Sequence, residues 1–219
     1  CHIEIKCLQE PIGKQDQYIA AYGGVTSFTF LRDGKVLAKP LQIPVQTLFE
    51  LEDHLLLFFT GFSRFASEIA QKQIDNFDQR QEHLKTMTSL VDEAQGVLQS
   101  DSRPIREIGD LLNRSWQLKR ELADSVTTPK IDEIYDTALD AGAIGGKLLG
   151  AGGGGFVLLF VEPDKQEAVK ERLKDLCLGV RGARWVKDQQ FHLTLRFGRL
   201  TACSRFLLPG TLLLNCFFC

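Results

Sequence analysis

The stretch Lys147-Leu148-Leu149-Gly150-Ala151-Gly152-Gly153-Gly154-Gly155-Phe156 decides the fold of this chain. It places five of the nineteen glycines within six positions. Glycine allows backbone conformations in which successive N–H groups surround an anion. The apolar run 156–161 follows at once and is typical of a buried strand. We therefore expect a loop beside a phosphate or an active site, formed by Gly150, Gly152, Gly153, Gly154 and Gly155.

Gly150, Gly152 and Gly155 fit the pattern G-x-G-x-x-G of dinucleotide-binding proteins. That fingerprint needs a strand before the loop and a helix after it. Here we expect a helix before the loop and a strand after it, an order that argues against a Rossmann site.

The Walker A pattern fails as well. The spacing from Gly142 to Gly146-Lys147 is one residue short, and Leu148 stands where Ser or Thr must reach a metal ion. A packed turn is the alternative explanation for the glycines. Because each glycine costs about 0.5–1 kcal/mol relative to alanine in regular structure, we favour a loop that must closely approach a ligand.

The rest of the sequence predicts an α+β fold. Apolar residues at helical spacing predict helices, and short apolar or alternating runs predict strands. The expected helices cover 13–22, most of 63–99, a segment from Pro104, a segment from Pro129 that Gly142 ends, and 164–177. The expected strands cover 25–31, 35–41, 55–60, 156–161, 183–187 and 191–197.

The composition gives no sign of a nucleic-acid or membrane protein. The formal net charge is −2, so recognition of an anion must be local. The apolar tail 206–219 is too short for a transmembrane helix and is interrupted by Pro209, Gly210 and Asn215. No signal peptide is visible at the N-terminus, and the expected location is the cytoplasm.

The six cysteines form no C-x-x-C pair, and the four histidines are scattered. This pattern does not favour a zinc site, and we expect no metal held by protein side chains alone. In a reducing cytosol the cysteines would be free thiols.

A second candidate segment surrounds Asp16. This carboxylate lies in the first turn of the short helix expected at 13–22, where the helix dipole stabilises negative charge. An ordinary helix start is the alternative. Lys14, Gln15 and Gln17 give the turn a dense polar set, which favours a carboxylate that orients the proton of a substrate hydroxyl.

Taken together, these segments resemble the GHMP family of small-molecule kinases. The loop 150–156 is similar to the family's third, C-terminal glycine motif, and 13–24 is similar to the segment with its catalytic Asp. Three further segments, 60–64, 116–120 and 142–147, resemble the branch that phosphorylates D-glycero-D-manno-heptose 7-phosphate. The resemblance covers about residues 2–192.

The resemblance implies an ATP- and Mg²⁺-dependent kinase that acts on the anomeric C1 hydroxyl of a heptose 7-phosphate. Asp16 would be the catalytic aspartate, and the glycine loop would bind the nucleotide. The implied substrate-binding residues are Lys14, Gln15, Gln17, Tyr22, Gly23, Gly24, Arg64 and Lys119. The expected partners are a sugar phosphate and ATP, with no nucleic acid and no membrane, and a homodimer is left open.

The implied fold has three parts. Residues 1–48 would be the remnant of an N-terminal S5-like domain, and 49–192 a C-terminal ferredoxin-like α/β plait with added helices. Residues 193–219 would be an atypical hydrophobic tail.

One departure from the family concerns activity. The main ATP loop of the family, a Pro-x-x-x-Gly-Leu-Gly-Ser-Ser motif, does not occur in these 219 residues, so we expect the chain alone to have little or no kinase activity. Two alternatives remain open: another GHMP kinase, of galactokinase or mevalonate type, and a catalytically dead scaffold that acts as an interaction domain.

Overall fold

The computed structural model of the protein describes residues 1–9, 13–62 and 66–179. The long helices are α1 (Gln15–Tyr22), α2 (Val45–Asp53), α3 (Ala66–Asn76), α4 (Gln81–Leu98), α5 (Arg106–Arg120), α6 (Pro129–Asp140) and α7 (Gln166–Leu173). Short helical turns are η1 (His2–Cys7), η2 (Phe77–Arg80) and η3 (Pro163–Lys165). The strands are β1 (Thr26–Phe30), β2 (Val36–Pro40), β3 (Leu55–Phe59), β4 (Ala143–Leu148), β5 (Phe156–Val161) and β6 (Leu178–Gly179).

A four-stranded antiparallel sheet forms the larger part, with the spatial order β4-β5-β3-β6. The helices α3 to α6 connect β3 to β4, a hairpin joins β4 to β5, and α7 leads to β6. This is the β-α-β-β-α-β arrangement of a ferredoxin-like plait, with extra helices in the first connection. The predicted fold class is confirmed.

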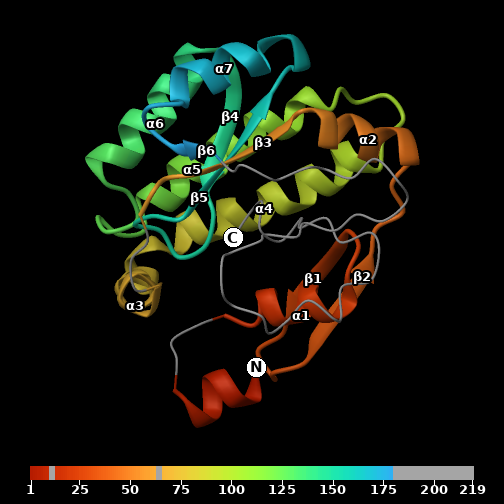
Figure 1. The fold of residues 1–219 in the computed structure, drawn as a ribbon. Helices are drawn as coiled ribbons and strands as arrows, with labels where there is room; N and C mark the ends of the chain where they lie inside the picture. The colour runs from red at the N-terminus through yellow and green to blue at the C-terminus, as the bar shows by residue number, and fades with distance from the viewer. Residues whose placement is uncertain (10–12, 63–65, 180–219) are drawn as a thin grey trace.

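The strand β5 separates two apolar cores, since its side chains point alternately to the two faces of the sheet. Leu158 and Phe160 belong to a core with α2, α4 and the first half of α5. Val157 and Leu159 belong to a second core with Trp116, α6 and α7. Figure 1 shows α4 on one side of the sheet and α6 and α7 on the other.

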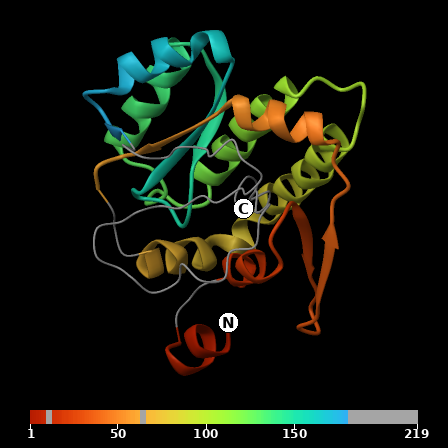
Figure 2. The same cartoon turned by 45° about the vertical axis from the view of Figure 1, so that its right-hand side comes forward.

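The smaller part consists of α1 and the antiparallel hairpin β1–β2. A turn at Asp33-Gly34 closes the hairpin, and Gly34 has a positive φ of 86°. Val25 and Leu41, which flank the hairpin, join the core around α4. Figures 1 and 2 show this unit beside α4, away from the four-stranded sheet.

The segment before the glycine loop corrects one prediction. Residues 143–148 form strand β4, so a strand and not a helix precedes the loop. Gly145 and Gly146 hid this strand, because glycine weakens a strand pattern. A Cβ atom on Gly145 would lie 2.1 Å from the carbonyl oxygen of Gly109 in α5, so the helix packs directly on the strand backbone. The argument against a dinucleotide-binding Rossmann site still holds, because a strand and not a helix follows the loop.

Two further helical segments differ from the prediction. Helix α2 was not expected, and the helix predicted over 164–177 is split into η3 and the shorter α7, with Gly179 in β6. The division predicted at residue 48 falls inside α2 and stays a prediction. The strands predicted at 183–187 and 191–197 and the tail 193–219 lie outside the described residues.

Candidate functional site

The glycine loop connects β4 to β5 and closes their hairpin. All five of its glycines have positive φ, from 73° at Gly150 to 154° at Gly154, a conformation that other residues rarely adopt. A Cβ atom on Gly152 would lie 2.8 Å from the carbonyl oxygen of Val126, and one on Gly154 would lie 2.8 Å from that of Phe62. Close packing against neighbouring backbone therefore accounts for part of the glycine content. A Cβ atom on Gly150 or Gly155 would meet open space.

Thr60 and Phe62 hold the C-terminal end of the loop. The N–H of Thr60 donates to the carbonyl oxygen of Gly155 at 2.8 Å, and the Thr60 hydroxyl lies 2.9 Å from the same oxygen. The N–H of Gly155 lies 2.9 Å from the carbonyl oxygen of Phe62 and 3.1 Å from the Thr60 hydroxyl. Thr60 comes directly after β3, so the loop is fixed to an inner strand of the sheet.

Two side chains bind carbonyl oxygens at the N-terminal end of the loop. The Nζ of Lys119, from the last turn of α5, donates to the oxygen of Gly150 at 2.6 Å. The Nε2 of Gln73, from α3, donates to the oxygen of Ala151 at 2.6 Å. Lys119 is only 4% exposed, although it was predicted to bind a substrate phosphate directly. Its ammonium supports the loop through the Gly150 oxygen, and a role for Lys119 in substrate binding stays a prediction.

The connection between α5 and α6 completes the support. The N–H of Gly153 donates to the carbonyl oxygen of Val126 at 2.9 Å. Arg120 forms an ion pair with Asp132 at 2.9 Å, and the Thr127 hydroxyl donates to the same carboxylate oxygen at 2.6 Å. These contacts fix the connection on which the loop rests.

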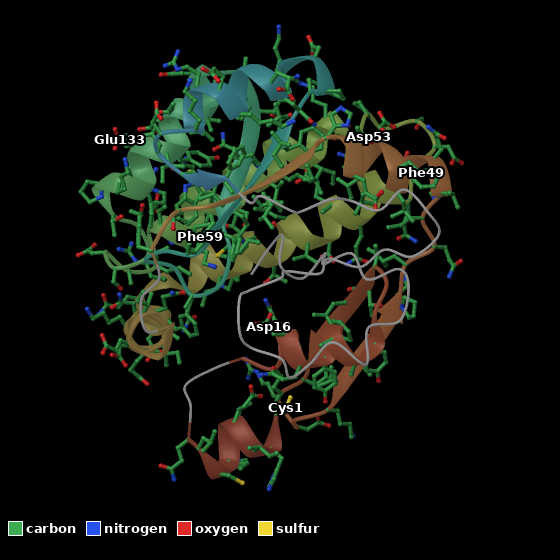
Figure 3. All side chains as sticks on the ribbon, in the orientation of Figure 1. Cys1, Asp16, Phe49, Asp53, Phe59 and Glu133 are labelled. Atoms are coloured by element: carbon green, nitrogen blue, oxygen red, sulfur yellow. The ribbon has the colours of Figure 1, made fainter. Side chains whose placement is uncertain are left out.

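Asp16 lies in the first turn of α1, as predicted, and is exposed. The helix is held in place by Ile19, which is buried. Figure 3 shows Asp16 at the start of α1 and Phe59 at the end of β3, in separate parts of the molecule. Among the residues that the structure describes, no hydrogen bond or ion pair joins Asp16 to the glycine loop.

The residues around Asp16 have mixed environments. Lys14 and Gln15 are half-buried beside it. The Nε2 of Gln17 donates to Glu4 at 2.7 Å, while its Oε1 is buried and forms no hydrogen bond with another described residue.

Tyr22, Gly23 and Gly24 lie at the other end of α1. Tyr22 is 55% exposed and stacks on Tyr18, with ring centroids 6.2 Å apart. Gly23 ends the helix with a φ of 70°, and the Thr26 hydroxyl donates to its carbonyl oxygen at 3.0 Å. The two glycines thus turn the chain into β1, a structural role that requires no ligand.

Of the other predicted features, Arg64 lies outside the described residues. Within residues 1–9, 13–62 and 66–179, no three His, Cys, Asp or Glu side chains gather where they could hold a metal ion. In the same ranges, no helix has the length and apolar character needed to cross a membrane.

Gln73 is the residue that the sequence did not single out. Its neighbours Gln71 and Lys72 are exposed polar residues of the same helix, so nothing in the local pattern distinguishes it. Its contact with Ala151 joins residues 78 positions apart, and only the tertiary structure brings them together.

Comparison with known proteins relates this chain to small-molecule kinases. Residues 95–177 match the protein family described as GHMP kinases C terminal. Over 158 residues the chain is 32% identical to the D-glycero-alpha-D-manno-heptose 7-phosphate kinase of Campylobacter jejuni, which covers 70% of this chain and 45% of that protein. Over 167 residues it is 28% identical to the mevalonate kinase of Pyrococcus horikoshii, covering 73% of this chain and 45% of that one.

The fold is similar to that of a solved D-glycero-D-manno-heptose 1-phosphate kinase from Bacteroides thetaiotaomicron. The TM-score is 0.56 at 28% identity, and the match covers 80% of this chain and 46% of that chain. The present chain therefore spans less than half the length of these relatives.

Proposed function

We propose, on the premise that residues 95–177 of this chain are a GHMP kinase C-terminal domain, that the protein is an ATP-dependent kinase of a sugar phosphate. The first candidate for the acceptor is the C1 hydroxyl of D-glycero-D-manno-heptose 7-phosphate. The relative with 32% identity is a kinase of that heptose phosphate.

The glycine loop is the observation that carries the proposal. It is fixed by hydrogen bonds to Thr60, Phe62, Gln73, Lys119 and Val126, which come from well-separated parts of the chain. Catalysis of phosphoryl transfer depends mainly on positioning and on stabilisation of the charge on the transferred group. A loop whose conformation is set before substrates bind can align N–H donors with phosphoryl oxygens without reorganising during the reaction.

Asp16 is the candidate for the general base that accepts the proton of the acceptor hydroxyl. In this scheme the hydroxyl oxygen forms a bond to the γ-phosphorus, the bond to ADP breaks, and the hydroxyl proton passes to the Asp16 carboxylate. The exposed position of Asp16 in the first turn of α1 leaves its oxygens accessible to an acceptor hydroxyl. Mg²⁺, when bound with the nucleotide, would neutralise part of the negative charge of the phosphates.

Substrate recognition would use the polar residues of the same segment. Lys14 offers a cation, and Gln17 offers an amide that can hydrogen-bond a sugar hydroxyl. Arg64 remains a candidate for the substrate's own phosphate. The two heptose kinases among the relatives carry different phosphate positions in their names, so the position of this phosphate has to be tested directly.

A mevalonate-type kinase is the second candidate. The 28% identity to the Pyrococcus horikoshii enzyme extends over 167 residues, slightly more of this chain than the heptose kinase match covers. Both candidates require the same chemistry at the loop and differ in the acceptor.

A substrate panel tests the proposal. ADP release is measured for the product of the complete reading frame with Mg-ATP and either heptose 7-phosphate, heptose 1-phosphate, mevalonate or L-fucose, and the 219-residue chain is measured in parallel. We expect the highest kcat/KM for heptose 7-phosphate and little turnover by the 219-residue chain. A preference for mevalonate would replace the proposed substrate, and absence of substrate-dependent ADP release from the complete product would overturn the proposed activity.

A further inference from the structure

We infer that Gln73 and Lys119 are positioning residues that aim the N–H groups of Ala151 and Gly152 at a phosphate group of a bound substrate. This inference rests on the proposed function, because it assigns a narrower anion-binding site within the same loop. It also gives Lys119 a different task from direct contact with the substrate.

The geometry follows from the planarity of the peptide unit. In a trans peptide the carbonyl oxygen of one residue and the N–H of the next point in opposite directions, and no cis peptide bond occurs among the described residues. The oxygen of Gly150 is turned toward Lys119 and the oxygen of Ala151 toward Gln73. The N–H groups of Ala151 and Gly152 therefore point away from these two side chains.

The peptide groups that carry the N–H groups of Gly153 and Gly155 have the opposite orientation, with the N–H directed into the protein. The N–H groups of Gly153 and Gly155 donate to the carbonyl oxygens of Val126 and Phe62. The same planarity turns the carbonyl oxygens of Gly152 and Gly154 away from those contacts, where they would repel an anion. The N–H groups of Gly153 and Gly155 are thus used by contacts within the protein, whereas those of Ala151 and Gly152 form no such contact with any described residue.

The two N–H groups of Ala151 and Gly152 are suited to an anion. No hydrogen bond from either group to another described residue is formed in the structure. Consecutive N–H groups around left-handed residues form the concave arrangement that binds phosphates in many proteins. Gly150 and Gly152, with φ of 73° and 116°, provide the left-handed residues here.

Lys119 adds a favourable charge. Its ammonium is almost fully buried and lies directly behind the peptide that carries the Ala151 N–H. A hydrogen bond from a cation to a carbonyl oxygen polarises the peptide and makes its N–H a better donor. Lys119 can therefore strengthen anion binding without touching the anion.

Gln73 is itself held in position. Helix α3 is anchored by Ile69, which is buried, and by Asn76, whose Nδ2 donates to the carbonyl oxygen of Leu122 at 2.9 Å. These contacts lie on either side of Gln73 along the helix. They keep its amide in reach of Ala151 before any ligand binds.

The test is an NMR titration of the ¹⁵N-labelled 219-residue chain with sodium pyrophosphate, followed by Mg-ATP. We expect the amide signals of Ala151 and Gly152 to shift most among the loop residues. Gln73→Met removes the donor but keeps the length of the side chain, and we expect it to raise the dissociation constant about five- to tenfold. Lys119→Met should have at least the same effect.

Gln71→Met is the matched control. Gln71 lies on the same helix, is exposed, and donates to Asp75 at 2.8 Å, so its replacement should leave the dissociation constant within about twofold. Gln73→Lys restores a donor at the test position and should recover part of the affinity. A merely structural role for Gln73 would lower the melting temperature without changing the dissociation constant.

The outcomes separate the inference from the proposed function. Equal pyrophosphate affinity of the wild type and Gln73→Met would overturn the inference and leave the kinase proposal standing. The inference would also be overturned, and the kinase proposal left standing, if pyrophosphate shifted the amide signals of Gly153 to Gly155 instead of those of Ala151 and Gly152. Shifts at Ala151 and Gly152 that depend on Gln73, in a protein whose complete reading frame shows no kinase turnover, would support the inference and overturn the function.

Discussion

Thr60 and Gly155 are joined by hydrogen bonds from both the backbone and the side chain of Thr60. The Thr60 N–H and hydroxyl both lie within 2.9 Å of the Gly155 carbonyl oxygen, and the Gly155 N–H is 3.1 Å from the hydroxyl. Because Thr60 follows β3 and Gly155 precedes β5, the contact extends the pairing of these strands by one residue beyond Phe59 and Phe156. The end of the glycine loop is therefore part of the sheet's structure.

Replacing Thr60 with valine tests this relationship. The change keeps the shape of the side chain, which is 3% exposed, and removes only the hydroxyl. Gly155 keeps its contacts with the Thr60 N–H and the Phe62 oxygen, so we expect a loss of about 1–2 kcal/mol in the free energy of unfolding. Urea denaturation measures it, and Thr60→Ser should retain most of the stability. Equal stability of Thr60→Val and the wild type would contradict the role of the hydroxyl.

The sequence predicted the glycine loop but not what fixes it. Short-range patterns identified the loop, the strand after it, and Asp16 in the first turn of α1. The contacts of Gln73 and Lys119 with the loop join residues 78 and 31 positions apart. Such contacts depend on the path of the chain, which no local pattern contains.

The missed strand β4 has a similar cause. Gly145 lies in β4 because α5 packs on its backbone, a requirement that comes from tertiary structure. Helix α2 was missed because it is short and comes directly after Pro44, in a segment interpreted as a domain boundary. The error at β4 thus arose where packing, and not local propensity, determines the conformation.

Gly145 and Gly96 should respond in opposite ways to alanine. In Gly145→Ala the new Cβ would lie 2.1 Å from the Gly109 oxygen, so α5 or β4 must move, and we expect a loss of about 3 kcal/mol or more. In Gly96→Ala, within α4, the nearest atom is the flexible end of Arg103 at 3.4 Å. Alanine should stabilise that helix by about 0.5–1 kcal/mol. Thermal unfolding measures both, and a stable Gly145→Ala variant would exclude the close helix–strand contact.

The free thiols should differ in reactivity. Cys177 is buried, and burial raises the pKa of its thiol to about 11, whereas Cys1 and Cys7 are exposed. Because the thiolate is the reactive form, we expect Cys177 to react with iodoacetamide at pH 8 about 100-fold more slowly than Cys1 and Cys7. Peptide mass spectrometry over time follows each site. Comparable rates at all three sites would show that α7 and β6 open readily.

Replacement of Asp16 with asparagine tests the proposed base. Asparagine has nearly the same shape but cannot accept the proton, so we expect kcat to fall about 10²–10⁴-fold in the product of the complete reading frame. Asp16 is exposed, so its replacement should leave the melting temperature unchanged. Asp101→Asn, at another exposed position, is the control for a change of one surface charge. Full turnover by Asp16→Asn would remove Asp16 from the mechanism.

The carboxyl group of Glu52 should make stability depend on pH. Burial, with a smaller contribution from the charge of Asp53, raises its pKa from an ordinary 4.5 to about 7. Between these values the folded protein binds a proton that the unfolded chain releases, so the contribution of Glu52 to stability is fully present below about pH 4.5 and is lost as the pH rises through 7. The side chain is only partly buried, so after allowance for solvent screening the loss is on the order of 1 kcal/mol.

Glu52→Gln removes this ionisation. We expect the variant to be more stable than the wild type at pH 8, by on the order of 1 kcal/mol, and equally stable at pH 4.5. Glu50→Gln changes the same charge at an exposed position of α2 and should not alter the slope of stability with pH. Urea denaturation at several pH values gives the three curves. If Glu52→Gln and the wild type run parallel from pH 4.5 to 8, Glu52 ionises freely and its surroundings in α2 are open to water.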